Sequence, residues 1–445
     1  MHPALDRFDA ALAALPGYHP RRIGYRLMCV GVIALVAGIP FSLALMNLGF
    51  GAALAGAVLA RVPLHTLPGF WFGIAFAAWQ ALSLAVMLAA IPTGNVRPPL
   101  TGLGLMYTWL TLYPAVVVLR NGAWRRRAFT ILVPVLVAVA ALALTQAVLG
   151  RPTPTAPLAT LSADASWLEK IWAKAIWPGP WRIRPGGEHI GSGFMSVHLT
   201  FGYIAGLLLC LHVHARDRLG LSATLTWAGR IAAAVAVAAS ASRLALLATV
   251  AGLAAGVAAR GRRWLAAAIG VAVVGLALAA TALWLFQPGK LDNLLRGDDG
   301  RWPIWRKAAV IAAEHPWFGV GSSDAYRKAD LELNQRLFPG KEMEFGKRGE
   351  RGAPHAHHTV LGIAAVHGIP AAALYCALLI SLLLAAWRRR LADPLGWRLA
   401  CSLIAATVVA GQFERVASGG EAMMALGVLL AVALLGKAND SALPA

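Results

Sequence analysis

The chain has 445 residues, of which 58% are hydrophobic and 13% are charged, and its mean hydropathy is +0.64. A soluble protein of this length carries about a quarter charged residues, so the composition excludes a soluble fold and predicts an all-α, polytopic integral membrane protein. The formal net charge of +20 comes mostly from arginines in short loops between apolar runs. Membrane topology and anionic lipids explain that charge better than a nucleic-acid partner does.

Five basic clusters orient the chain, because lysine and arginine gather in cytoplasmic loops. They lie at residues 21–26, 120–127, 214–218, 259–264 and 387–398. If all five face the cytoplasm, an even number of spans must separate each pair. The apolar runs satisfy this condition with about twelve transmembrane helices and both termini inside, near residues 25–42, 44–60, 70–91, 101–119, 128–149, 192–214, 221–240, 243–259, 264–286, 358–387, 396–413 and 420–436.

Two of these runs contain residues that disturb a helix. Pro40 falls within the apolar run assigned to the first pair of spans, and the boundary between these two helices can lie at a different residue. The long run near 358–387 contains the sequence His367-Gly368-Ile369-Pro370, which predicts a kink or an interruption.

Two long segments between spans then fall on the outer side of the membrane. The first, residues 150–191, contains "WLEKIWAKAIW", whose apolar residues recur at helical spacing. This pattern predicts an amphipathic helix at the lipid interface, and the alternative is an ordinary exposed loop helix. The second, near residues 287–356, is long enough to be functional or a small domain of its own. Within it, "WPIWRKAAVIAAEHPW" followed by glycines predicts a helix with a glycine stop.

The chain therefore divides into three parts. Residues 1–286 carry nine spans with the interfacial segment at 150–191, residues 287–356 form the large, partly helical outer loop, and residues 357–445 carry the last three spans. Ionisable residues are almost absent from the interiors of the spans and gather at their outer ends. Transporters mark their pathway with such residues at mid-membrane, so chemistry at the outer face fits better than conduction.

Three histidines, His355, His357 and His358, stand where the outer loop becomes apolar. They have three interpretations: a polar cap on a helix, a metal site, or a general base. The H-x-H-H spacing lacks the i, i+4 pattern of zinc helices, and no H-E-x-x-H or C-x-x-C partner is present, so we expect no metal. A neutral imidazole titrates near working pH, which suits a base. His367, further along, is expected to be a buried helix histidine.

Two arginines have both an anchoring and a functional interpretation. An arginine at the outer end of a span is often an interfacial anchor. Arg243, however, sits in the small apolar sequence "SASRLALL" without an acidic neighbour, and its guanidinium suits a phosphate or diphosphate headgroup. Arg301 in "GDDGRWPIW" has Asp298 and Asp299 as possible partners, which weakens the functional interpretation.

Three segments, in this order, resemble the O-antigen ligase and polymerase superfamily of bacterial envelope enzymes. "SASRLALLATVAGL" is similar to the Ser-Arg segment that opens a helix in that family, and "GRWPIWRKAAVIAAEHPWFGVGSSDAY" to its Arg-x-x-x-Trp segment with a Pro-x-x-Gly-x-Gly turn. "HHTVLGIAAVHGIP" resembles the His-Asn-x-x-Leu signature, except that His358 stands where asparagine is usual. The resemblance covers under a fifth of the chain, and that departure leaves open which histidine acts.

The resemblance implies a GT-C-like membrane glycosyltransferase of the bacterial inner membrane, with its active site facing the periplasm. Its donor would be O-antigen on undecaprenyl diphosphate, and its acceptor a sugar of lipid A-core. Carried over by motif, His357 is the candidate base, and Arg243 and Arg301 are the candidate diphosphate ligands. Arg306, His355 and His358 are candidate substrate-binding residues, and neither a metal nor another cofactor is expected.

Other functions share parts of this pattern. An O-antigen polymerase or a protein O-oligosaccharyltransferase would carry the same motifs and differ in its acceptor. A lipid-linked glycan flippase or another transporter would also have about twelve helices, but it would need charged residues inside the spans. The two cationic regions, which suit two anionic lipid substrates, favour the ligase.

Overall fold

The computed structural model describes residues 23–90, 108–149, 198–286, 301–338, 355–414 and 420–435, and every regular element in these ranges is helical. The prediction of an all-α fold is therefore confirmed for the described part of the chain. The expected interfacial helix in residues 150–191 lies outside the described residues. The longer helices are α2 (Ile23–Gly38), α3 (Leu43–Leu59), α4 (Phe70–Ala90), α5 (Leu112–Leu119), α6 (Gly122–Leu149), α9 (His198–His214), α10 (Ala223–Ala239), α11 (Arg243–Ala258), α12 (Leu265–Phe286), α14 (Arg301–Glu314), α15 (Ser323–Leu337), α16 (Thr359–His367), α17 (Ile369–Arg388), α18 (Pro394–Phe413) and α19 (Gly420–Leu434).

Each predicted span contains a described helix, the span near 358–387 contains two, α16 and α17, and the helices differ in length. Among the described residues, four helices are long and apolar enough to cross a membrane: α4, α6, α17 and α18. Shorter apolar helices, including α2, α3, α9, α10, α11 and α19, occupy most of the other predicted spans. A multi-pass membrane protein is supported, and the number of about twelve spans stays a prediction.

The predicted interruption near residues 367–370 is present. Gly368 separates α16 from α17 with a φ of 89°, and Pro370 stands in the first turn of α17. A Cβ at Gly368 would overlap the carbonyl group of Trp317, so both the backbone angle and the available space require glycine here. Trp79 of α4 donates its indole N–H to the carbonyl of His367 over 3.2 Å. His367 itself is buried, as expected.

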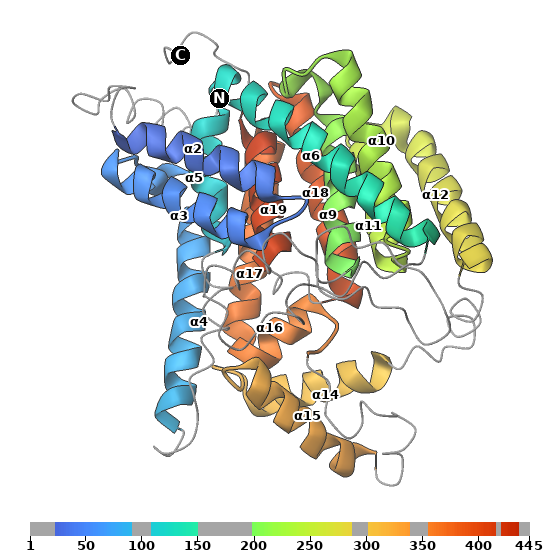
Figure 1. The fold of residues 1–445 in the computed structure, drawn as a ribbon. Helices are drawn as coiled ribbons and strands as arrows, with labels where there is room; N and C mark the ends of the chain where they lie inside the picture. Colours follow the sequence, from blue (N-terminus) through green and yellow to red (C-terminus); the bar gives the residue numbers. More distant parts are fainter. Residues whose placement is uncertain are drawn as a thin grey trace, which may run out of the picture.

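The relative directions of three central helices follow from their contacts. Gly206 of α9 faces Thr249 of α11, and Cys210 faces Gly252, so these two helices run parallel. Tyr203 of α9 shares a 2.8 Å hydrogen bond with Thr407 of α18, whereas Cys210 lies further along α9 beside Ser402, so α18 runs antiparallel to both. The start of α11 and the end of α18 therefore lie at the same end of the bundle (Figure 1).

Helices α14 and α15 form a separate layer, residues 301–338, below the bundle in Figure 1 and next to α16. The predicted helix with a glycine stop is α14, and Gly319 and Gly321 in the turn after it both have positive φ. Buried Lys307 of α14 contacts Asp330 over 2.8 Å and Asn334 over 2.6 Å, which joins α14 to α15. This α14–α15 layer also donates backbone hydrogen bonds to α16, from Val320 and Gly321 to the carbonyls of residues 365 and 366.

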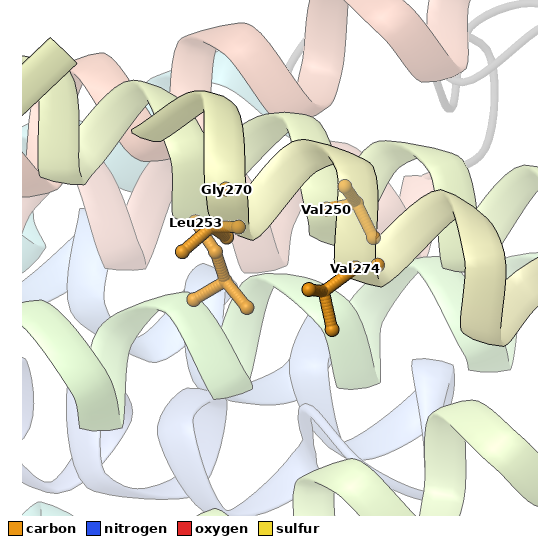
Figure 2. A pocket seen from close by; sticks show the side chains of 6 residues that line it. Val250, Leu253, Gly270 and Val274 are labelled. Carbon is orange, nitrogen blue, oxygen red and sulfur yellow. The ribbon is translucent and has the colours of Figure 1, made fainter. Parts of the chain in front are cut away.

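An apolar groove lies between α11 and α12 (Figure 2). It is lined by Val250, Leu253, Gly270, Val271, Val274 and Gly275.

Candidate active site

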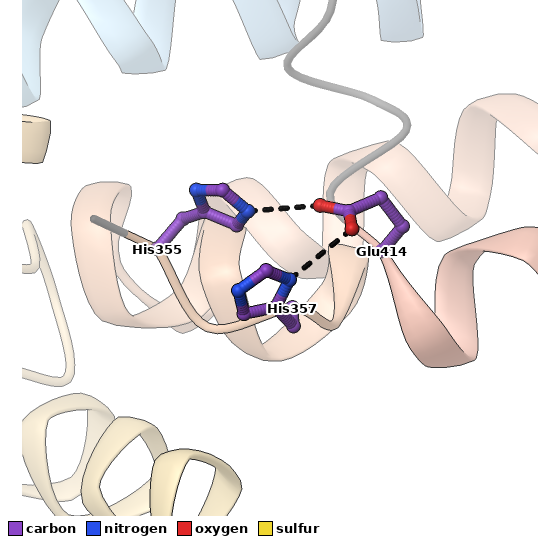
Figure 3. Close-up of side chains that lie close together, drawn as sticks. All are labelled: His355, His357 and Glu414. Carbon is purple, nitrogen blue, oxygen red and sulfur yellow. Dashed lines mark hydrogen bonds and ion pairs between the residues drawn. The ribbon is translucent and has the colours of Figure 1, made fainter. Parts of the chain in front are cut away.

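His355, His357 and Glu414 converge at the point where the chain enters α16 and leaves α18 (Figure 3). Nε2 of His355 lies 2.8 Å from one carboxylate oxygen of Glu414, and Nδ1 of His357 lies 3.1 Å from the other. All three side chains are partly buried, with 17–26% of their surface exposed. One carboxylate thus holds both imidazole rings, whose centroids lie 4.2 Å apart.

Local packing brings Glu414 to the histidines. Glu414 is the residue at which α18 ends and the backbone becomes extended, with φ −152° and ψ 158°. The hydroxyl of Thr359, the first residue of α16, donates a 2.9 Å hydrogen bond to the backbone carbonyl of Glu414. Gly411, one turn earlier in α18, leaves room for Thr359 against the helix. The start of α16 is therefore fixed against the end of α18.

His357 has a strained backbone, with a φ of 49°. A non-glycine residue in this region costs roughly 1–3 kcal/mol and persists only where its surroundings impose the conformation. Trp305 of α14 contributes, because its indole N–H donates to the carbonyl of His357 over 3.4 Å. Strain of this kind is typical of functional residues.

His358 has a different role from its two neighbours. Its Nδ1 accepts a 3.2 Å hydrogen bond from the backbone N–H of Leu361, so His358 is the N-cap of α16. Its ring packs at nearly a right angle to the ring of Trp305, and burial lowers the pKa of the imidazole. The polar-cap interpretation therefore fits His358, whereas His355 and His357 face the carboxylate.

The structure places the three candidate arginines differently. The guanidinium of Arg301 lies over the ring of Phe413, 5.5 Å from the ring centroid, and Phe413 directly precedes Glu414 in the sequence. Arg306 points elsewhere, because its guanidinium lies over Phe338 at the end of α15. Arg243 opens α11 and therefore lies at the same end of the bundle as Glu414. Arg301 thus lies beside the residue that precedes Glu414, whereas Arg306 lies beside the end of α15.

The charge state of Glu414 determines on which ring nitrogen each histidine carries its proton. Burial alone would raise the pKa of the Glu414 carboxyl, but the hydrogen bonds and charge of His355 and His357 outweigh it and hold the pKa well below its ordinary value. An ionised carboxylate only accepts hydrogen bonds, so His355 must carry its proton on Nε2 and His357 on Nδ1. In neutral His357, Nε2 is then the nitrogen that accepts a proton.

The same three side chains are the group in the described part of the chain that could hold a metal ion, with ligand atoms within 4.8 Å of one another. Two histidines and a glutamate are a common zinc donor set. Ligands of a tetrahedral zinc at about 2.1 Å from the metal lie roughly 3.4 Å apart. The separations of 2.8 and 3.1 Å are shorter and correspond to hydrogen bonds.

Glu414 was not identified from the sequence. It lies 57 residues after His357, beyond the three helices α16, α17 and α18, so spacing within the histidine motif carries no information about it. The available signal was its position, because it is an acidic residue directly after the predicted span 396–413 in a chain with 20 acidic residues. The argument against a metal from H-x-H-H spacing was incomplete for the same reason, since the third donor comes from a distant helix.

Part of the chain matches a known protein family. Residues 228–376, about a third of the chain, match the family described as O-antigen ligase. The matched segment contains Arg243, Arg301 and the three histidines, and Glu414 lies beyond it. No curated protein matches the chain.

Proposed function

Because residues 228–376 match the family described as O-antigen ligase, we propose that this chain is an O-antigen ligase of the bacterial inner membrane. It transfers O-antigen glycan from undecaprenyl diphosphate to a sugar hydroxyl of lipid A-core. The reaction takes place at the periplasmic face of a GT-C-like fold of about twelve spans, with residues 287–356 as a periplasmic domain. The observation that carries the proposal is the pairing of His357 with Glu414 beside Arg301.

His357 acts as the general base in this mechanism. With Nδ1–H bonded to the Glu414 carboxylate over 3.1 Å, its Nε2 accepts the proton of the acceptor hydroxyl as that oxygen attacks the anomeric carbon. The carboxylate fixes the tautomer and orientation of the ring and stabilises the imidazolium that forms. His355 shares the same carboxylate through Nε2 and positions it.

The arginines act on the leaving group. As the bond between the anomeric carbon and the diphosphate oxygen breaks, negative charge develops on the diphosphate. Arg301 and Arg243 supply fixed positive charge and bidentate donors to that group, which is the role a metal ion has in other enzymes. A single displacement inverts the anomeric configuration, and the glycosyl diphosphate already stores the energy, so the reaction needs no nucleotide.

The biological test is the lipopolysaccharide pattern of a deletion strain. Loss of the whole O-antigen ladder, with lipid-linked polymer still accumulating, supports the ligase. A product with a single repeat unit indicates the polymerase of the same superfamily, and an unchanged ladder excludes both.

The biochemical test is transfer by the purified protein. His357→Ala should abolish transfer while expression and membrane insertion remain normal, and near-normal transfer would overturn the base assignment. Activity should persist in excess EDTA. A loss that added divalent ion restores would show instead that transfer requires a metal, for which His355, His357 and Glu414 are the candidate ligands.

A further inference from the structure

Trp305 of α14 contacts the histidine side of the candidate site. It stands in the second turn of the helix, and its indole N–H donates a 3.4 Å hydrogen bond to the carbonyl of His357. The ring of Trp305 also packs at 86° to the ring of His358, with the two centroids 5.8 Å apart. Trp305 therefore contacts the backbone of His357 and the side chain of the residue after it.

The same indole ring contacts the carboxylate side of the site through Phe413. The centroids of the Trp305 and Phe413 rings lie 6.4 Å apart, and Phe413 directly precedes Glu414. Arg301 lies one turn before Trp305 on the same face of α14, and its guanidinium covers the Phe413 ring at 5.5 Å. The four-residue spacing of Arg301 and Trp305 thus places both side chains at the end of α18.

The backbone of His357 is held from three directions. Its φ of 49° costs free energy in a non-glycine residue and persists only where the surroundings impose it. On either side, His355 is bonded to Glu414 and His358 caps α16. The hydrogen bond from Trp305 holds the carbonyl between them. The direction of the His357 ring, and hence its 3.1 Å approach to Glu414, depends on that backbone angle.

We propose that Trp305 is a positioning residue for glycan transfer, because it holds the backbone of His357 against the end of α18 so that the imidazole meets the Glu414 carboxylate. The inference rests on the proposed function, in which His357 is the base. Trp305 acts through His357 and not on the substrate. Its loss should therefore lower kcat and leave the KM for the lipid donor nearly unchanged.

Two substitutions separate the hydrogen bond from the ring contacts. Trp305→Phe keeps an aromatic ring near Phe413 but removes the N–H, and loss of one neutral hydrogen bond should lower kcat about 2- to 12-fold. Trp305→Ala removes both contacts, and a base displaced by about 1 Å should lower kcat about 100-fold. Trp302→Ala is the matched control, because Trp302 lies on the same helix and is 72% exposed, and it should change neither kcat nor KM.

Combination with Glu414→Gln gives a result that a merely structural role would not give. If Trp305 acts through the base–carboxylate pair, Trp305→Ala should lower kcat less than about 10-fold in the Glu414→Gln background, because the pair is already disrupted. The full effect in both backgrounds overturns the proposal, and so does a near-normal kcat in Trp305→Ala with an unchanged melting temperature. If Trp305→Ala does not fold, Trp305→Phe carries the same comparison, and its smaller effect should disappear in the Glu414→Gln background.

The position of His357 can also be measured without transfer. Diethylpyrocarbonate modifies accessible, unprotonated imidazole nitrogens, and mass spectrometry identifies the modified histidine. His357 should be modified several times faster in Trp305→Ala than in the wild type, and no faster in Trp302→Ala. If this difference is present but the wild type transfers no glycan, the proposed function fails and the positioning of His357 by Trp305 stands. If the wild type transfers glycan and Trp305→Ala leaves the modification rate unchanged, the positioning fails and the function stands.

Discussion

Replacement of Glu414 by glutamine tests the central pair of the site. The amide keeps the shape of the carboxylate but removes its charge, and only one of its two terminal atoms accepts a hydrogen bond. In the native protein both carboxylate oxygens accept, from Nε2 of His355 and Nδ1 of His357. The variant therefore cannot hold both rings in their present tautomers.

The size of the effect follows from those contacts. A hydrogen bond to a charged group contributes about 1.5–3 kcal/mol, which corresponds to roughly 10- to 150-fold in rate if the bond strengthens as His357 becomes an imidazolium. We expect kcat for glycan transfer by Glu414→Gln to fall by that factor, with the KM for the polyprenyl donor nearly unchanged. Glu414→Asp, which keeps the charge, should recover part of the loss.

The assay is transfer of labelled glycan from the lipid donor in nanodiscs, with melting temperature measured in parallel. A variant that keeps the native melting temperature and transfers within twofold of wild type would refute the role of Glu414. Equal loss of kcat and melting temperature in Gln and Asp variants would show a structural role instead.

Three further predictions concern the fold around the site. Gly368→Ala should lower stability by about 2–4 kcal/mol in chemical denaturation, because φ is 89° and a Cβ would overlap Trp317, whereas Gly51→Ala should not destabilise. Lys307→Met leaves the Asp330 carboxylate buried without its cation and should cost about 3–5 kcal/mol, and the double variant Lys307→Met with Asp330→Leu should recover most of it; a single variant as stable as wild type contradicts the buried pair. Because the folded-state pKa of Glu414 is depressed, its contribution to stability is present above its ordinary pKa near 4.5 and is lost as the pH falls further; the stability gap between wild type and Glu414→Gln should close in acid, and a gap independent of pH would contradict the ionised carboxylate.

The helical framework was accessible from the sequence because long apolar runs report directly on apolar helices. The interruption at Gly368 was also visible, since glycine followed closely by proline cannot continue a regular helix. The lengths of the individual helices could not be predicted as well from the sequence. Several apolar runs fold into helices of 15–17 residues, which hydropathy alone does not distinguish from full crossings.

The chemistry of the site depended on contacts between distant segments. Arg301 and Arg306 looked equivalent in the sequence, yet α14 turns the first toward Phe413 and the second toward Phe338. The three histidines also looked equivalent, but His358 caps α16 while the other two share Glu414. The side to which each residue points is set by how α14, α16 and α18 pack together, and that arrangement is not encoded in local spacing.

The interruption at Gly368 has a mechanical consequence for the site. It separates α16 from α17, and α16 and the histidines before it are bound to the α14–α15 layer. The bonds are the backbone hydrogen bonds from Val320 and Gly321 and the hydrogen bond from Trp305 to His357. Glu414, by contrast, ends a helix of the bundle. Together with the hydrogen bond from Thr359 to the carbonyl of Glu414, the two imidazole–carboxylate hydrogen bonds therefore connect the α14–α15 layer to the bundle through α16. A shift of the layer relative to the bundle would also shift His357 relative to Glu414, so the packing of the layer bears directly on the orientation of the base.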